Sequence, residues 1–126
     1  MNLLLVGLGG FLGAISRYAL SGFAQRFSTS GFPLGTLVVN TLGCLVIGFV
    51  GWLVVDRPAV SDNARLFISV GFLGSLTTFS AFSYETLALI KDELWLSAGA
   101  NIALNVTLGL LAVVGGWASA KSLLGN

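Results

Sequence analysis

One segment, residues 71–85, concentrates the residue types that can handle a small ion. It reads Gly71-Phe72-Leu73-Gly74-Ser75-Leu76-Thr77-Thr78-Phe79-Ser80-Ala81-Phe82-Ser83, and Glu85 follows shortly after. Gly74-Ser75 predicts a break in a helix, because glycine is a poor helix former. A break at membrane depth is tolerated only inside protein or along a cavity. Its freed carbonyls suit a cation, whereas an exposed helix N-terminus and hydroxyl groups suit an anion.

The residues after the predicted break favour an anion path. Hydroxyl side chains recur there, at Thr77, Thr78, Ser80 and Ser83. Phe79 and Phe82 are three residues apart and therefore share one helical face. They either pack against lipid or core, or turn their electropositive ring edges toward an anion. Ring edges carry no fixed charge that would trap the anion, and this suits conduction.

Other polar residues lie within apolar stretches. They are Arg17, Asn40, Glu85, Asn101 and Asn105. Polar groups at membrane depth are functional candidates. The alternative for each asparagine is a hydrogen bond between helices, and for Arg17 it is extension of the side chain toward a nearby interface.

The composition indicates an integral membrane protein. Of 126 residues, 56% are hydrophobic and only 9% charged, and the mean hydropathy is +0.95. This excludes a soluble enzyme, a nucleic-acid-binding protein and a disordered chain. The chain has no histidine, and its one cysteine, Cys44, is expected to be a small packing residue.

The distribution of charge predicts an all-α fold of four transmembrane helices in a single domain, residues 1–126. No charged residue occurs in 27–55, 66–84 or 94–120, and a spanning helix needs about 20 apolar residues. The predicted spans are about 2–25, 34–55, 64–91 and 95–121. Asp56-Arg57-Pro58 is expected to end the second span.

The flanking charges give almost no preferred orientation. With the N-terminus inside, the inner flanks hold Arg57, Arg65 and Lys121, and the outer flanks hold Arg26 and Lys91. The excess is three minus two, a single positive charge. Because orientation depends on this asymmetry, the chain either inserts both ways or relies on a weak bias.

Small residues predict close helix packing and an oligomer. In the first span Gly7, Gly10, Gly13 and Ala14 fall on one helical face, which Arg17 shares. In the second they fall at Asn40, Gly43, Cys44, Gly48 and Gly51. In the fourth they fall at Ser97, Asn101, Asn105, Gly109, Ala112 and Gly116.

These features resemble the Fluc fluoride channels, also called CrcB proteins. The resemblance rests on three motifs and covers essentially the whole chain. They are Gly9-Gly10-Phe11-Leu12-Gly13-Ala14-Ile15-Ser16-Arg17-Tyr18, Gly35-Thr36-Leu37-Val38-Val39-Asn40 with Gly43 and Gly48, and the segment 71–85.

The resemblance implies a passive fluoride-selective channel in the inner membrane of a prokaryote, which exports fluoride from the cytoplasm and confers fluoride resistance. It also implies an antiparallel, dual-topology homodimer with two pores and a structural sodium ion at its centre. The sodium ligands would be the backbone carbonyls of Gly74 and Thr77 from both subunits. The pore phenylalanines would be Phe79 and Phe82. The remaining pore residues would be Asn40, Ser80, Ser83 and Glu85, with Arg17 at the vestibule.

Three further pore residues, Thr78, Asn101 and Asn105, are predicted from this chain's own polar pattern. The chain departs from many family members at Ser75, where they have glycine, and at Ala81, where they have threonine.

Two other functions stay open at this stage. Small proton-coupled multidrug exporters are also short and four-helical, but they depend on a carboxylate deep in the first helix, and residues 1–55 contain none. The second alternative function is that of a membrane subunit without transport activity. An enzyme is disfavoured, because nothing near the hydroxyls of the third span would activate a nucleophile.

Overall fold

The described residues form four helical spans. The computed structural model describes residues 1–56 and 60–125, so Arg57 and Pro58, which the charge count and the predicted end of the second span invoke, lie outside the described residues. Each of the four helical spans is long and apolar enough to cross a membrane. The elements are α1 (Asn2–Gln25), α2 (Leu34–Val55), α3 (Asp62–Arg65), η1 (Leu66–Leu73), α4 (Gly74–Leu76), α5 (Phe79–Lys91) and α6 (Trp95–Leu124).

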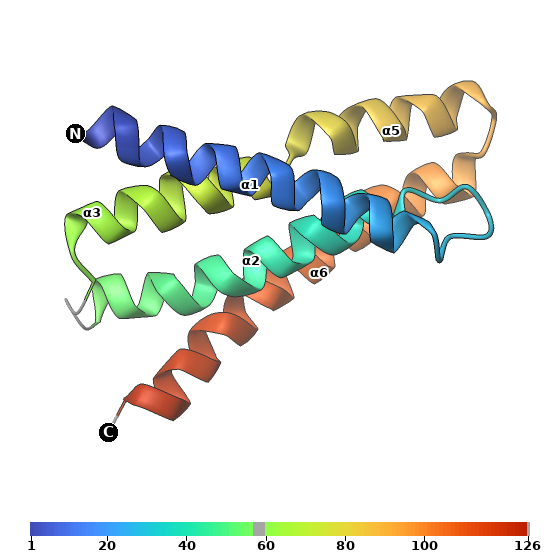
Figure 1. The fold of residues 1–126 in the computed structure, drawn as a ribbon. Coiled ribbons are helices and arrows are strands. Elements are labelled where there is room, and N and C mark those ends of the chain that lie inside the picture. The colour runs from blue at the N-terminus through green and yellow to red at the C-terminus, as the bar shows by residue number, and fades with distance from the viewer. Residues whose placement is uncertain (57–59, 126) are drawn as a thin grey trace.

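The third span is segmented, whereas the other three are continuous. It starts at Ser61, whose side chain accepts a hydrogen bond from the Ala64 N–H at 3.2 Å and so caps α3. It then passes through the π-helix η1 and the short α4 before α5 begins. Figure 1 shows α3 and α5 at opposite ends of α1, with the intervening segments crossing it.

Glycines set the contact between α1 and η1. A Cβ at Gly9 would collide with the carbonyl oxygen of Phe67, and one at Gly13 with that of Phe72. A Cβ at Gly7, which was expected on the packing face, would meet no atom of another described segment within 4 Å. The packing face is therefore rotated from the predicted stripe, because Gly9 and Gly13 lie one helical turn apart and bring the two backbones together.

A second close contact joins α2 to α6. A Cβ at Gly48 would meet the Val113 carbonyl oxygen, and one at Gly116 would meet the Leu45 carbonyl oxygen. Both glycines belong to the predicted stripes. The two helices cross in Figure 1, and their crossing places Asn40 of α2 beside Asn105 of α6.

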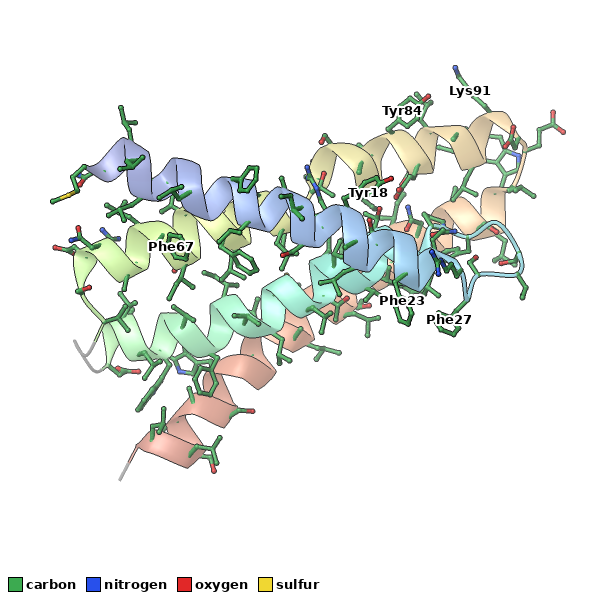
Figure 2. The ribbon with its side chains drawn as sticks, in the orientation of Figure 1. Tyr18, Phe23, Phe27, Phe67, Tyr84 and Lys91 are labelled. Atoms are coloured by element: carbon green, nitrogen blue, oxygen red, sulfur yellow. The ribbon has the colours of Figure 1, made fainter. Side chains whose placement is uncertain are left out.

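Large apolar side chains cover the outside of this bundle. Leu3 of α1 and Leu96 of α6 are 88% and 90% exposed. Figure 2 shows Tyr84 and Lys91 projecting from the side of α5 that faces away from the other helices. An apolar exterior on four spanning helices identifies a multi-pass membrane protein.

Candidate functional site

The third span loses helical geometry at Thr77 and Thr78. Thr77 has φ −83° and ψ 156°, and Thr78 has φ −152° and ψ 117°, so both are extended. The break had been predicted at Gly74-Ser75, but Gly74 is helical, with φ −61° and ψ −29°. The helix continues further because the Thr77 N–H still donates to the Leu73 carbonyl at 3.1 Å.

Asn40 of α2 forms hydrogen bonds with the backbone at the point where the helix ends. The Thr78 N–H donates to Asn40 Oδ1 at 2.8 Å, and Asn40 Nδ2 donates back to the Thr78 carbonyl at 3.1 Å. In an uninterrupted helix the Thr78 N–H would bond the Gly74 carbonyl. The asparagine thus provides hydrogen-bond partners for the N–H and the carbonyl of the extended residue Thr78 at membrane depth. As a result, the Gly74 carbonyl does not receive the Thr78 N–H as its donor.

The α5 helix restarts with a side-chain cap. Thr78 Oγ1 accepts a hydrogen bond from the Ala81 N–H at 3.1 Å and lies 3.2 Å from Ser80 Oγ. The cap satisfies one of the N–H groups that a helix start leaves free. Ser83, one turn further, donates to the Phe79 carbonyl at 2.9 Å.

A cavity of about 390 Å³ lies against the break. The Phe79 and Phe82 rings both line it, with centroids 5.4 Å apart and planes tilted by 53°. The predicted shared face of these rings is confirmed. The lining also includes Asn40, Gly43, Gly74, Thr77, Thr78 and Asn105.

A second cavity, of about 370 Å³, lies near the loop between α1 and α2. Glu85 lines it, and its Oε1 accepts a hydrogen bond from Thr36 Oγ1 at 2.6 Å. Glu85 Oε2 is buried and has no hydrogen-bond partner among the described residues. Ser21, Gln25 and Gly35 belong to the same wall.

The helix-four asparagines have different positions. Asn105 lines the first cavity, whereas Asn101 is fully buried, with 0% exposure, and lines neither cavity. Asn101 Nδ2 donates to Thr86 Oγ1 at 2.9 Å. Arg17 is half-buried on α1 and also lines neither cavity.

Sequence reasoning missed Thr36 and Thr86 as partners of the predicted residues. Each is a hydroxyl residue inside a predicted apolar span, and this is the sequence signal that would have singled them out as candidates. The structure shows that both are buried. Their partners, Glu85 and Asn101, are 49 and 15 residues away in sequence. No local periodicity relates such pairs, so only the folded chain identifies them.

Comparison with known proteins gives a consistent result. The family described as CrcB-like protein, Camphor Resistance (CrcB), matches residues 4–117. A protein of Clostridium perfringens strain 13 named fluoride-specific ion channel FluC is 46% identical over 95% of this chain and 94% of its own length. Proteins with the same name from Desulforapulum autotrophicum and Nitratiruptor sp. are 46% and 50% identical, over 88% and 82% of this chain and 89% and 79% of their own lengths.

Proposed function

The chain belongs to the CrcB family, and on that premise we propose that it is a passive, fluoride-selective ion channel. The observation that carries the proposal is the cavity at the break, where the Phe79 and Phe82 rings meet Thr77 and Thr78. The channel exports fluoride from the cytoplasm across the inner membrane of a prokaryote, and the relatives' bacterial sources support this location.

The residues around this cavity suit a small, strongly hydrated anion. Fluoride gives up its water only where hydrogen-bond donors replace it. Hydroxyl groups are such donors: that of Thr78 lines the cavity, and those of Ser80 and Ser83 follow it on α5. The ring edges of Phe79 and Phe82 add positive character without a full charge. The path continues past Glu85 of the second cavity, and Arg17 serves the aqueous vestibule.

The functional unit is an antiparallel homodimer with two pores. Phe79 is 79% exposed in a single chain although it lies within the third span, so its ring has a face for a second copy to cover. The balanced flanking charges support insertion in both orientations. Rings from both subunits then contribute to each pore.

The end of α4 fits a sodium ion at the centre of that dimer. The Gly74 carbonyl lacks its helical donor because the Thr78 N–H bonds Asn40, and Gly74 and Thr77 line the same cavity. Backbone carbonyls at an unwound helix are the oxygen ligands that sodium takes in membrane proteins. When bound, the ion supplies positive charge to a core that has no charged residue in 66–84.

Fluoride efflux from liposomes tests this function. We expect rapid fluoride efflux, negligible chloride efflux, and loss of fluoride efflux in Phe79→Ile and Phe82→Ile. Phe23→Ile is the matched control, because Phe23 forms another ring pair, with Phe27 at 5.3 Å, at the far end of α1 (Figure 2). A folded protein without fluoride efflux would contradict the channel.

Replacement of sodium by a large organic cation tests the metal separately. We expect the loss of dimers, of fluoride efflux, or of both. Protein that keeps its dimer and its flux without sodium would show that the Gly74 and Thr77 carbonyls hold no essential ion.

A further inference from the structure

A chain of hydrogen bonds leaves the break and returns to the same helix through two others. It starts at the Thr78 backbone, crosses to α2 and α6, and ends at the Phe82 carbonyl. Its steps are Thr78 N to Asn40 Oδ1 (2.8 Å), Asn40 Nδ2 to Asn105 Oδ1 (3.1 Å), Asn105 Nδ2 to Asn101 Oδ1 (2.9 Å), Asn101 Nδ2 to Thr86 Oγ1 (2.9 Å) and Thr86 Oγ1 to the Phe82 carbonyl (2.8 Å).

The groups at the two ends of this chain determine the direction of every hydrogen bond within it. A backbone N–H only donates, so the Thr78 end requires the oxygen of the Asn40 amide to face it. The nitrogen of Asn40 must then face Asn105, and the same reasoning orients Asn105 and Asn101 in turn. The Phe82 carbonyl only accepts, which matches a donating Thr86 hydroxyl at the other end.

The amide hydrogens along this chain are committed to protein partners. Asn40 Nδ2 donates to the Thr78 carbonyl and to Asn105 Oδ1. Asn105 Nδ2 donates to the carbonyl and the Oδ1 of Asn101. Because an amide nitrogen carries two hydrogens, neither asparagine has one left for an anion in this structure. Asn101 is fully buried and lines neither of the two cavities described above.

The two ends of the chain enclose the first turn of α5. Thr78 precedes Phe79, and Phe82 is the second of the two cavity rings. Asn40 of α2 holds the N–H of Thr78. The Phe82 carbonyl accepts from the hydroxyl of Thr86 on the same helix, and that hydroxyl accepts from Asn101 of α6. These two attachments to neighbouring helices determine how this turn is rotated. The tilt between the rings depends on that rotation, since both rings project from the turn.

We propose that Asn101, Asn105 and Thr86 are positioning residues that set the rotation of the Phe79–Phe82 turn and thereby the selectivity of the pore. They act through hydrogen bonds to Asn40 and to the Phe82 carbonyl without contacting the anion. This inference rests on the proposed channel function and assigns to Asn101 a role other than lining the pore, and to Asn105 a role in addition to lining the first cavity.

The test measures fluoride and chloride efflux from liposomes for Asn101→Leu, Thr86→Val and the double variant. We expect each single variant to lower the fluoride-to-chloride flux ratio about tenfold, the change expected from losing one ordinary hydrogen bond. The double variant should be no worse than either single one, because both interrupt the same chain.

Two controls separate positioning from general damage. Thr86→Ser keeps a hydroxyl and should restore the wild-type ratio. Thr107→Val removes an exposed hydroxyl of α6 whose hydrogen bond, among the described residues, is to the Ala103 carbonyl of its own helix. This variant should leave the ratio unchanged. If Asn101→Leu does not fold, Thr86→Val carries the test, since it removes only a hydroxyl.

Each outcome decides the proposal. Wild-type ratios in both single variants, with fluoride flux intact, overturn the positioning role while the channel function stands. A loss of thermal stability together with a loss of flux, at an unchanged fluoride-to-chloride flux ratio, also overturns the positioning role. That result would indicate a merely structural role. A wild-type protein without fluoride flux overturns the channel and the positioning role together.

Discussion

Asn40 holds Thr78 by both of its backbone groups: it accepts from the Thr78 N–H at 2.8 Å and donates to the Thr78 carbonyl at 3.1 Å. The two residues are 38 positions apart in sequence. Through this pair, α2 replaces the helical partners that the third span lacks at its break. The extended conformation of Thr78 is stable at membrane depth because the asparagine satisfies it.

Asn40→Asp should destabilise the protein although it barely changes the shape of the side chain. The carboxylate still accepts from the Thr78 N–H, but it cannot donate to the Thr78 carbonyl or to Asn105 Oδ1. Each buried group left unpaired costs about 1–3 kcal/mol. Thermal unfolding in detergent measures the loss.

The matched control is Asn63→Asp on α3, where the asparagine is exposed. We expect its unfolding free energy to stay within about 0.5 kcal/mol of wild type. Equal stability of the Asn40 and Asn63 variants would show that the bonds to Thr78 contribute nothing.

Thr78→Val should weaken the start of α5. The substitution removes the oxygen that accepts from the Ala81 N–H, and loss of such a cap costs about 1 kcal/mol. Hydrogen exchange at the Ala81 amide should accelerate. Thr78→Ser keeps the acceptor and should retain protection, so accelerated exchange in the serine variant would argue against the cap.

Gly116→Ala and Gly48→Ala should disrupt the crossing of α2 and α6. The added methyl group meets a backbone carbonyl, which cannot rotate away, and overpacking of this kind costs about 1–3 kcal/mol. The midpoint of thermal unfolding should fall in both variants.

Gly99→Ala on the same helix is the control for the glycine substitutions. Its new methyl group has nothing within 4 Å, so we expect no loss, and a gain of up to about 1 kcal/mol from helix propensity. A fall in stability as large as that of Gly116→Ala would remove the packing explanation.

Gln25→Ala should loosen the α1–α2 loop. Gln25 Oε1 accepts from the Gly35 N–H at 2.9 Å, and its Nε2 donates to the Phe32 carbonyl at 2.9 Å. Loss of both bonds should raise hydrogen exchange at the Gly35 amide and destabilise the fold by about 1–3 kcal/mol, at 0.5–1.5 for each bond.

Gln25→Glu separates the two bonds of this side chain. Glutamate keeps an acceptor for the Gly35 N–H and loses the donor to Phe32. Gly35 should therefore stay protected in the glutamate variant. Protection that persists in the alanine variant as well would mean that the N-terminus of α2 does not need Gln25.

The sequence by itself determined the four spans, because charged residues are too costly for the centre of a bilayer and their absence delimits each helix. It also determined that Phe79 and Phe82 share a face, since their spacing is a property of the helix alone. The polar segment of the third span was recognisable for the same local reason.

Only the tertiary structure decided where helical geometry stops and what the asparagines do. The break is at Thr77 and Thr78 because Asn40, far away in sequence, offers the bonds that an extended residue needs. Asn101 is buried against Thr86 instead of lining the cavity, and Gly9 replaces Gly7 at the contact with η1. Hydrogen bonds and close contacts between distant segments depend on how the helices cross, and no periodicity within one helix contains that information.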